Sequence, residues 1–377
     1  MIKTMLKLII GWRLYIALVS LIAIQLIAFK PTFPYAAELL EPTGHPLFWG
    51  LANFDGVHYL GIADKGYFAQ FTQAFFPLYP IVMNLVDKLF HNLILSGLLI
   101  SHVSLIIFAI VLYRLVLLDH QKVVAESTLL FYLVFPTSFF FAALYTESMF
   151  MALVVGTFLA ARKKRWLLAG ILGGFASATR LFGVLLLPAL IIEFWQQHQS
   201  KNILATIRSK WRELIGITLS ASGLLAYMRY LATNFSDPLY FLHAQPVFGA
   251  QRTADKIILL YQVFWRYTKM MVTVEPLSLL YYTVTQEFFL SLTFLVLLII
   301  AARKIRLSYI VFGALAYILP TLTGTLSSQP RYLLIVFPAF IILGQIKNKK
   351  IRFLLYALSS LLLAINLSLF TRGYWVS

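Results

Sequence analysis

The chain of 377 residues contains no cysteine, which excludes disulfide bonds and thiolate chemistry. Charged residues are also scarce, at 12% of the sequence, whereas 60% of the residues are hydrophobic. Acidic residues are the rarest charged class: 14 stand against 31 basic residues, and the formal net charge is +17. A soluble domain of this length needs more charged surface, so the composition excludes an ordinary soluble enzyme.

The sequence is instead rich in apolar runs close to the length that crosses a bilayer as a helix. The first run is long for the apolar region of a signal peptide and is followed by Lys30 and Pro31, so we expect it to be retained. We predict an all-α polytopic membrane protein that forms one domain over residues 1–377, with about eleven transmembrane helices. The candidate spans are 8–29, 93–117, 123–141, 145–161, 166–178, 181–196, 213–232, 278–302, 308–325, 332–346 and 351–371.

Basic residues cluster in the short connections between these runs, as expected of cytoplasmic loops rather than of a nucleic-acid-binding surface. A cytoplasmic N-terminus places every cluster on one side of the membrane and the C-terminus on the other. Two non-cytoplasmic loops, about 30–92 and about 233–277, are then long enough to build an active site. The clusters are Lys3/Lys7/Arg13, Arg162–Arg165, Lys201/Arg208/Lys210/Arg212, Arg303/Lys304/Arg306 and Lys347/Lys349/Lys350/Arg352.

Arg180 divides the apolar stretch 166–196 into two short halves, for which we predict two helices. The alternative is a single kinked span. It would invert the sidedness of everything that follows and would place the basic residues 347–352 outside, against the positive-inside rule.

Asp55 lies in the first outer loop, between an aromatic residue and a glycine. The spacing of Phe54, Val57 and Gly61 predicts a short helix on the membrane surface. Partial desolvation at that depth is expected to raise the basicity of the Asp55 carboxylate. The local sequence leaves two interpretations open: a catalytic base, or an ordinary helix cap.

The segment 53–67 resembles the W-D-x-x-H-[YF]-x-x-I-A-x-x-G-Y signature of the PIG-V mannosyltransferase family, with Phe54 in place of the usual Trp. Further blocks follow in the family's order, so the resemblance runs from residue 53 to residue 338. They are Phe75-Phe76-Pro77-Leu78-Tyr79-Pro80, Tyr145-Thr146-Glu147-Ser148, Ala178-Thr179-Arg180 with Gly183, Asp237-Pro238-Leu239 through Phe241 and Gln245, and Pro330-Arg331-Tyr332 with Pro338.

This resemblance implies a GT-C-like fold and an inverting glycosyltransferase. Such an enzyme moves a hexose, here expected to be mannose, from a polyprenyl-phosphate carrier to a lipid-linked or glycan acceptor on the non-cytoplasmic face. Asp55 would be the base that accepts the proton of the acceptor hydroxyl. The leaving lipid phosphate is a weak base, so it needs cations rather than a general acid. The resemblance points to Arg180, Arg331 and His58 as its ligands.

The resemblance implies a metal-independent enzyme without a cofactor, in which the sugar-carrying lipid phosphate is a substrate. A metal site would use Asp55, His58 and Asp64, and it is the alternative. The resemblance also makes Glu147 a substrate-binding candidate, although it could instead orient an arginine or be a plain acid at a helix N-terminus. Further substrate-binding candidates are Tyr59, Tyr79, Gln245 and Tyr332.

The two arginines have a second interpretation each. Arg180, at a membrane boundary, could snorkel to lipid headgroups, and Arg331 could be an interface anchor. In the second outer loop, residues 254–273 have the amphipathic pattern of an interfacial helix. That helix could act as a lid or carrier-lipid guide, or it could simply rest on the surface.

Two other classes of function remain open. A transporter or lipid flippase would place charges at the membrane midplane and usually show repeated halves, and neither pattern is visible. A non-catalytic assembly subunit would tolerate replacement of Asp55. We expect a prokaryotic plasma membrane, or the endoplasmic reticulum if the source is eukaryotic. The expected partners are the donor, the acceptor and membrane lipids, but no nucleic acid.

Overall fold

The computed structural model describes residues 2–198, 203–249, 252–253 and 256–376. Within these ranges the regular elements are all helices and no strand occurs, which confirms the predicted all-α class. Lys201, Ala254 and Asp255, which belong to predicted segments, lie outside the described residues.

Within the described ranges, five helical segments are long and apolar enough to cross a membrane. A sixth span results if the helix pair α12 (Trp211–Leu219) and α13 (Ser222–Phe235), bent by 49°, counts as one. The prediction of about eleven spans is therefore not confirmed. The five are α1 (Ile2–Leu26), α6 (Leu93–Val116), η5 (Leu181–Leu185) continued by α10 (Leu186–His198), α16 (Leu279–Ala301) and α20 (Lys349–Thr371).

The other apolar runs form helices too short to cross about 30 Å of hydrocarbon alone. Many of their residues are buried in protein, as in α8, which packs against both α6 and α9. A helix that is apolar all round can face either lipid or a protein core, so the sequence pattern alone does not decide how many of these runs span the membrane. These helices are α7 (Lys122–Val134), α8 (Glu147–Arg162), α9 (Trp166–Thr179), α17 (Leu307–Thr321) and α19 (Phe337–Gly344).

The chain breaks at Arg180, as predicted. Helix α9 ends at Thr179, Arg180 is extended with φ −155° and ψ 151°, and η5 begins at the next residue. Gly183 then approaches α9 so closely that a Cβ there would lie 2.4 Å from the carbonyl carbon of Ala176. Two separate helices are thus joined by a tight turn that holds Arg180.

The two predicted outer loops contain short helices. The first loop holds α2 (Ala36–Leu39), α3 (Pro46–Trp49), α4 (Asp55–Lys65) and α5 (Leu78–Phe90), so the short helix predicted around Asp55 is confirmed. The second loop holds α14 (Tyr240–His243), η6 (Gln245–Phe248) and α15 (Leu260–Thr273). The predicted amphipathic helix therefore begins at Leu260, later than expected.

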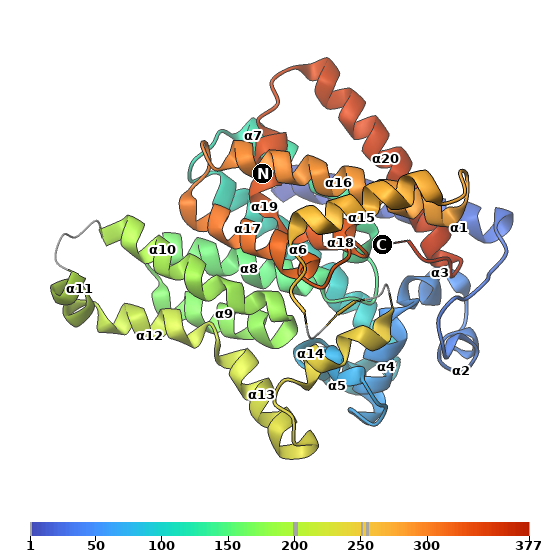
Figure 1. Ribbon diagram of the computed structural model, residues 1–377, viewed down its shortest axis with the longest axis horizontal. Helices are drawn as coiled ribbons and strands as arrows, with labels where there is room; N and C mark the ends of the chain where they lie inside the picture. Colours follow the sequence, from blue (N-terminus) through green and yellow to red (C-terminus); the bar gives the residue numbers. More distant parts are fainter. Residues whose placement is uncertain (1, 199–202, 250–251, 254–255, 377) are drawn as a thin grey trace.

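These loop helices come together in space. Figure 1 shows α14 beside α4 and α5, and the ring of Phe241 packs against Phe76 of the first loop at 5.4 Å. The short helix α11 (Ile203–Ser209), from one of the basic clusters, lies at one end of the molecule's long axis, and α2 lies toward the other. Parts of the two loops thus pack against each other through α14 and the Phe76 segment.

Candidate active site

The backbone before Asp55 is strained. Phe54 has φ 58° and ψ −116°, a conformation that a residue with a bulky side chain rarely adopts. Its ring packs against Phe33, Phe370 and Trp375, with centroid distances of 4.7, 5.6 and 5.2 Å. The buried Asn53 donates from Nδ2 to the Phe370 carbonyl at 2.7 Å. Surrounding contacts of this kind are what allow a strained residue to persist at a functional site.

The hydroxyl of Tyr145 fixes the backbone on both sides of Phe54. It donates to the Asn53 carbonyl at 2.8 Å and accepts from the Asp55 N–H at 3.1 Å. The carboxylate of Asp55 caps no backbone N–H in the described part of the chain, and its hydrogen-bond partner is Arg331. The geometry therefore does not support the helix-cap interpretation.

Four charged side chains from distant parts of the sequence form one continuous cluster, which we call the charge chain. Arg331 Nη1 donates to Asp55 Oδ2 at 2.5 Å, and Arg331 Nε donates to Glu147 Oε1 at 2.5 Å. Arg180 Nη1 donates to the same Glu147 oxygen at 2.5 Å. The order is Asp55–Arg331–Glu147–Arg180, with Arg331 on α18 (Gln329–Tyr332) and Glu147 at the start of α8.

The charge chain is mostly withdrawn from solvent. Arg180 is 8% exposed, Arg331 7% and Glu147 1%, whereas the side chain of Asp55 is 23% exposed. Buried charges need partners, because an unpaired ion in a low-dielectric interior is costly. Burial and pairing on this scale contradict both the snorkelling interpretation of Arg180 and the interface-anchor interpretation of Arg331.

Aromatic rings surround the two guanidinium groups. The Arg331 guanidinium lies 4.7 Å from the ring centroid of Tyr145 and 5.0 Å from that of Phe140. The Arg180 guanidinium lies 5.6 Å from the rings of Phe182 and Tyr332. Cation–π contacts add to the ion pairs in fixing where the arginines point.

The electrostatics of Asp55 differ from the sequence-based expectation. Burial raises the pKa of the Asp55 carboxyl, but the charge and hydrogen bond of Arg331 outweigh it, so that the pKa lies below the ordinary value of 3.8. The predicted rise in basicity was therefore wrong for the structure as it stands. Its cause is a partner 276 residues away, which the local sequence does not show. Asp55 is ionised at neutral pH.

His58 lies one helical turn beyond Asp55. Burial lowers its pKa, and the opposing effect of the Asp55 carboxylate is smaller, so the imidazole is neutral at neutral pH. Its ring stacks on Phe75 at 4.8 Å and meets Phe248 of the second loop edge-on at 5.7 Å. His58 is therefore next to Asp55 and beneath the second loop.

One polar atom of the charge chain, the buried Oε2 of Glu147, has no hydrogen-bond partner within the described residues. The ring of Tyr59, a residue 4% exposed, lies 6.4 Å from that of Tyr145. A buried acceptor without a partner costs about 1–3 kcal/mol, which a ligand hydroxyl could recover.

The remaining predicted residues are spread more widely. Tyr332 contacts Arg180, as described, whereas the fully buried Tyr79 bonds to the Gly97 carbonyl and to Ser101 of α6, each at 3.0 Å. Gln245 lies in η6 and donates to the Phe241 carbonyl at 3.2 Å. Their roles as substrate ligands stay predictions. Asp64, the third member of the alternative metal set, is exposed at the far end of α4 and is paired with Lys65 at 4.0 Å.

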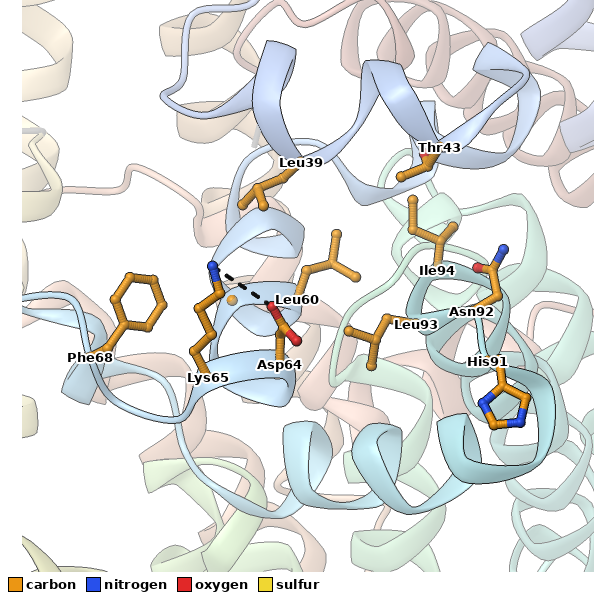
Figure 2. Close-up of a pocket in the computed structure, with 11 residues that line it drawn as sticks. Leu39, Thr43, Leu60, Asp64, Lys65, Phe68, His91, Asn92, Leu93 and Ile94 are labelled. Carbon is orange, nitrogen blue, oxygen red and sulfur yellow. Dashed lines mark ion pairs between the residues drawn. The ribbon is translucent and has the colours of Figure 1, made fainter.

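A cavity of about 300 Å³ lies at that far end of α4, away from Asp55 (Figure 2). Its wall combines apolar and polar side chains from the first loop and the start of α6. No member of the charge chain lines it. Figure 2 shows Leu60, Asp64 and Lys65 on α4 facing residues from the other elements, and the lining residues are Leu39, Thr43, Leu60, Gly61, Asp64, Lys65, Phe68, His91, Asn92, Leu93 and Ile94.

The sequence missed three contributors to this site. Tyr145 stands inside the block that contains Glu147, but nothing in that block shows that its hydroxyl positions Asp55. Phe248 and the neighbouring Arg252 belong to no recognisable pattern. The one available signal was that Arg252 is a cation in a predicted outer loop.

The family model for mannosyltransferase (PIG-V) matches residues 28–230, more than half of the chain. The chain belongs to this mannosyltransferase family. The matched range contains Asp55, Glu147 and Arg180, and Arg331 lies beyond it. Together with the apolar helices, this membership makes the protein an integral membrane protein.

The chain is also similar to GPI mannosyltransferase 2 of Drosophila pseudoobscura pseudoobscura, with 32% identity over 134 residues. The aligned part is 31% of this chain and 28% of the length of that relative. The similarity thus spans less than a third of either protein. Family membership favours glycosyl transfer over the transporter and flippase alternatives.

Proposed function

We propose that this PIG-V family member is an inverting mannosyltransferase that uses a polyprenyl-phosphate mannose donor. The acceptor is a hydroxyl group of a lipid-linked or glycan substrate on the non-cytoplasmic face. The observation that carries the proposal is the charge chain, in which a partly exposed, ionised Asp55 is paired with the buried Arg331, and Glu147 links Arg331 to the buried Arg180. A base beside cations is the combination that glycosyl transfer from a lipid phosphate requires.

The reaction exchanges one bond at the anomeric carbon for another. The acceptor oxygen attacks that carbon from the face opposite the phosphate and forms the new glycosidic bond. The bond between the anomeric carbon and the phosphate oxygen breaks, and its electron pair stays on the phosphate. The acceptor hydroxyl proton passes to Asp55, so the products are the glycosylated acceptor, a polyprenyl phosphate and a protonated carboxyl group.

Arg331 affects Asp55 in two opposing ways. Its charge keeps the carboxylate ionised, which is the form that accepts a proton, but it also lowers the pKa and hence the basicity. A donor phosphate beside the Arg331 guanidinium adds a negative charge near Asp55 and offsets part of that effect. Arg331 Nη2 makes no hydrogen bond in the described part of the chain and is the group that a phosphate oxygen could use.

The direct test is product formation by the purified full-length protein. It is incubated with mannosyl-phosphoryl-polyprenol and a lipid extract, and products are identified by mass spectrometry. The expected product is a lipid or glycan whose mass has risen by one hexose. A panel of polyprenyl-phospho-hexoses defines the sugar, and failure to transfer from every donor in the panel contradicts the proposal.

A further inference from the structure

The second outer loop passes over the Asp55 region. The ring of Phe248 packs against Phe75 at 5.3 Å and against His58 at 5.7 Å. Gly249, which follows, has φ 76°, a backbone conformation that favours glycine, and its carbonyl accepts from the Arg252 N–H at 3.4 Å. Arg252 therefore follows Phe248 by four residues, and Phe248 contacts His58, which lies one helical turn from Asp55.

The same loop is attached to the segment that leads to Arg331. Thr253 donates from its backbone N–H to the Thr323 carbonyl at 3.1 Å, and Ile258 donates to the Leu322 carbonyl at 3.0 Å. Gly324, at φ 90°, completes this turn and leads into the segment that carries α18. Arg252 is thus fixed between Phe248 on one side and the 322–324 turn on the other.

The charge chain itself offers an anionic ligand no net charge. Its two carboxylates, Asp55 and Glu147, balance its two guanidinium groups, and His58 is neutral. Arg252 is a partly buried cation whose guanidinium makes no hydrogen bond or ion pair within the described residues. Its positive charge lies close enough to contribute to the lowered pKa of Asp55.

A phosphodiester that joins a sugar to a polyprenol carries one negative charge. Arg252 supplies the one positive charge that the neutral charge chain lacks. We propose that Arg252 binds the phosphate of the lipid-linked sugar donor and that the second loop thereby contributes a donor ligand to the site. This inference rests on the proposed function, since it names a ligand of the same donor. Arginine suits this task because its planar guanidinium binds phosphate oxygens in pairs.

The test compares binding of two probes to the full-length protein in detergent. One probe is mannosyl-phosphoryl-polyprenol, and the other is the neutral polyprenyl mannoside without the phosphate. Arg252→Gln is expected to weaken binding of the phosphate-bearing probe about 10- to 100-fold and to leave the neutral probe unaffected. Arg252→Lys, which keeps the charge, is expected to retain part of the affinity. Lys256→Gln is the matched control, an exposed cation of the same loop.

The outcomes separate the two proposals. Wild-type protein that binds both probes equally overturns the donor assignment and Arg252 together. Wild-type protein that prefers the phosphate-bearing probe, with Arg252→Gln unchanged, overturns only the role of Arg252. A third measurement determines the binding of phosphatidylglycerol, which is also a phosphodiester. If Arg252→Gln loses phosphatidylglycerol but keeps the donor, Arg252 is a lipid-headgroup ligand and the inference is wrong.

Discussion

The guanidinium of Arg331 binds the carboxylate of Asp55 although 276 residues separate the two in the chain. The same guanidinium binds Glu147, which also holds Arg180. Four separate blocks of the sequence are therefore joined in one electrostatic unit. The consequence is that a change at any of these residues acts on the others.

Asp55→Asn tests the base directly. The amide keeps the size of the side chain but cannot accept a proton, so turnover is expected to fall by about 10²–10⁴-fold. Donor binding is expected to survive, because the arginines remain. The measurement is kcat with a verified donor and acceptor. Asp64→Asn, on the exposed far end of α4, is the control and is expected to keep its activity. Near-normal turnover in Asp55→Asn would move the base elsewhere, with Glu147 the next candidate.

Arg331→Ala is expected to lower the free energy of unfolding as well as the enzymatic activity. The substitution leaves the Asp55 carboxylate without a cation partner in the charge chain and removes one of the two guanidinium groups bound to Glu147. Loss of one partner from a buried ion pair costs about 3–5 kcal/mol. The free energy of unfolding in an SDS titration measures this. Arg229→Ala, an exposed arginine on α13, provides the comparison and should change little. Equal stability of both variants would show that the charge chain does not stabilise the fold.

The pH dependence of kcat/KM tests whether the ion pair with Arg331 lowers the pKa of Asp55. Because Arg331 holds the pKa of Asp55 below 3.8, wild-type activity should show no acidic loss from this residue until the pH falls below that value. The contribution of the pair to the free energy of unfolding is likewise present above the unfolded pKa and lost as the pH falls through the lower folded pKa.

In Arg331→Gln, burial dominates and the pKa of Asp55 rises, so the acidic limb of the residual activity is expected to move toward neutral pH. Arg229→Gln should leave the limb in place. An unmoved limb in Arg331→Gln would mean that another group sets the acidic side of the profile.

Tyr145→Phe removes the hydroxyl that fixes the backbone around Phe54. The Asn53 carbonyl and the Asp55 N–H both lose their partner, which is expected to cost about 1–3 kcal/mol in the free energy of unfolding. Because the strained turn is also released, kcat should fall beyond any effect on stability. Tyr317→Phe is the matched control: its buried hydroxyl donates to the Ser291 carbonyl at 2.9 Å, in a hydrogen bond that involves no residue of the charge chain. The control should lose stability without losing kcat.

The side of the membrane on which residues 65 and 163 lie can be measured with single introduced cysteines, because the chain has no native cysteine. Lys65→Cys and Lys163→Cys place single thiols at exposed positions, in the predicted first outer loop and in the basic turn after α8. A membrane-impermeant maleimide applied from one side is expected to label only one of them. Labelling of both from the same side would overturn the topology and the non-cytoplasmic location of the site.

Much of this protein was determined by the sequence alone. The apolar runs and the few charges require a membrane protein, since such a chain cannot cover itself with polar surface in water. The signature around Asp55 and the later blocks indicated the family, which the family match confirms. They also singled out Asp55, Glu147, Arg180 and Arg331 one by one. These features depend on composition and on local pattern, both of which are visible in the chain.

The tertiary structure decided three further points. Apolar runs that face protein cannot be distinguished by composition from runs that face lipid, and only the structure shows that α7, α8, α9, α17 and α19 each end before they are long enough to span a membrane alone. The partner of Asp55 lies 276 residues away, and the direction of its pKa shift depends on that partner rather than on the depth of its own helix. The position of Arg252 near the same carboxylate depends on the hydrogen bonds that attach its loop to residues 322 and 323. Ion pairs and loop contacts of this range form only when the chain is folded, because they join residues with no local relation in the sequence.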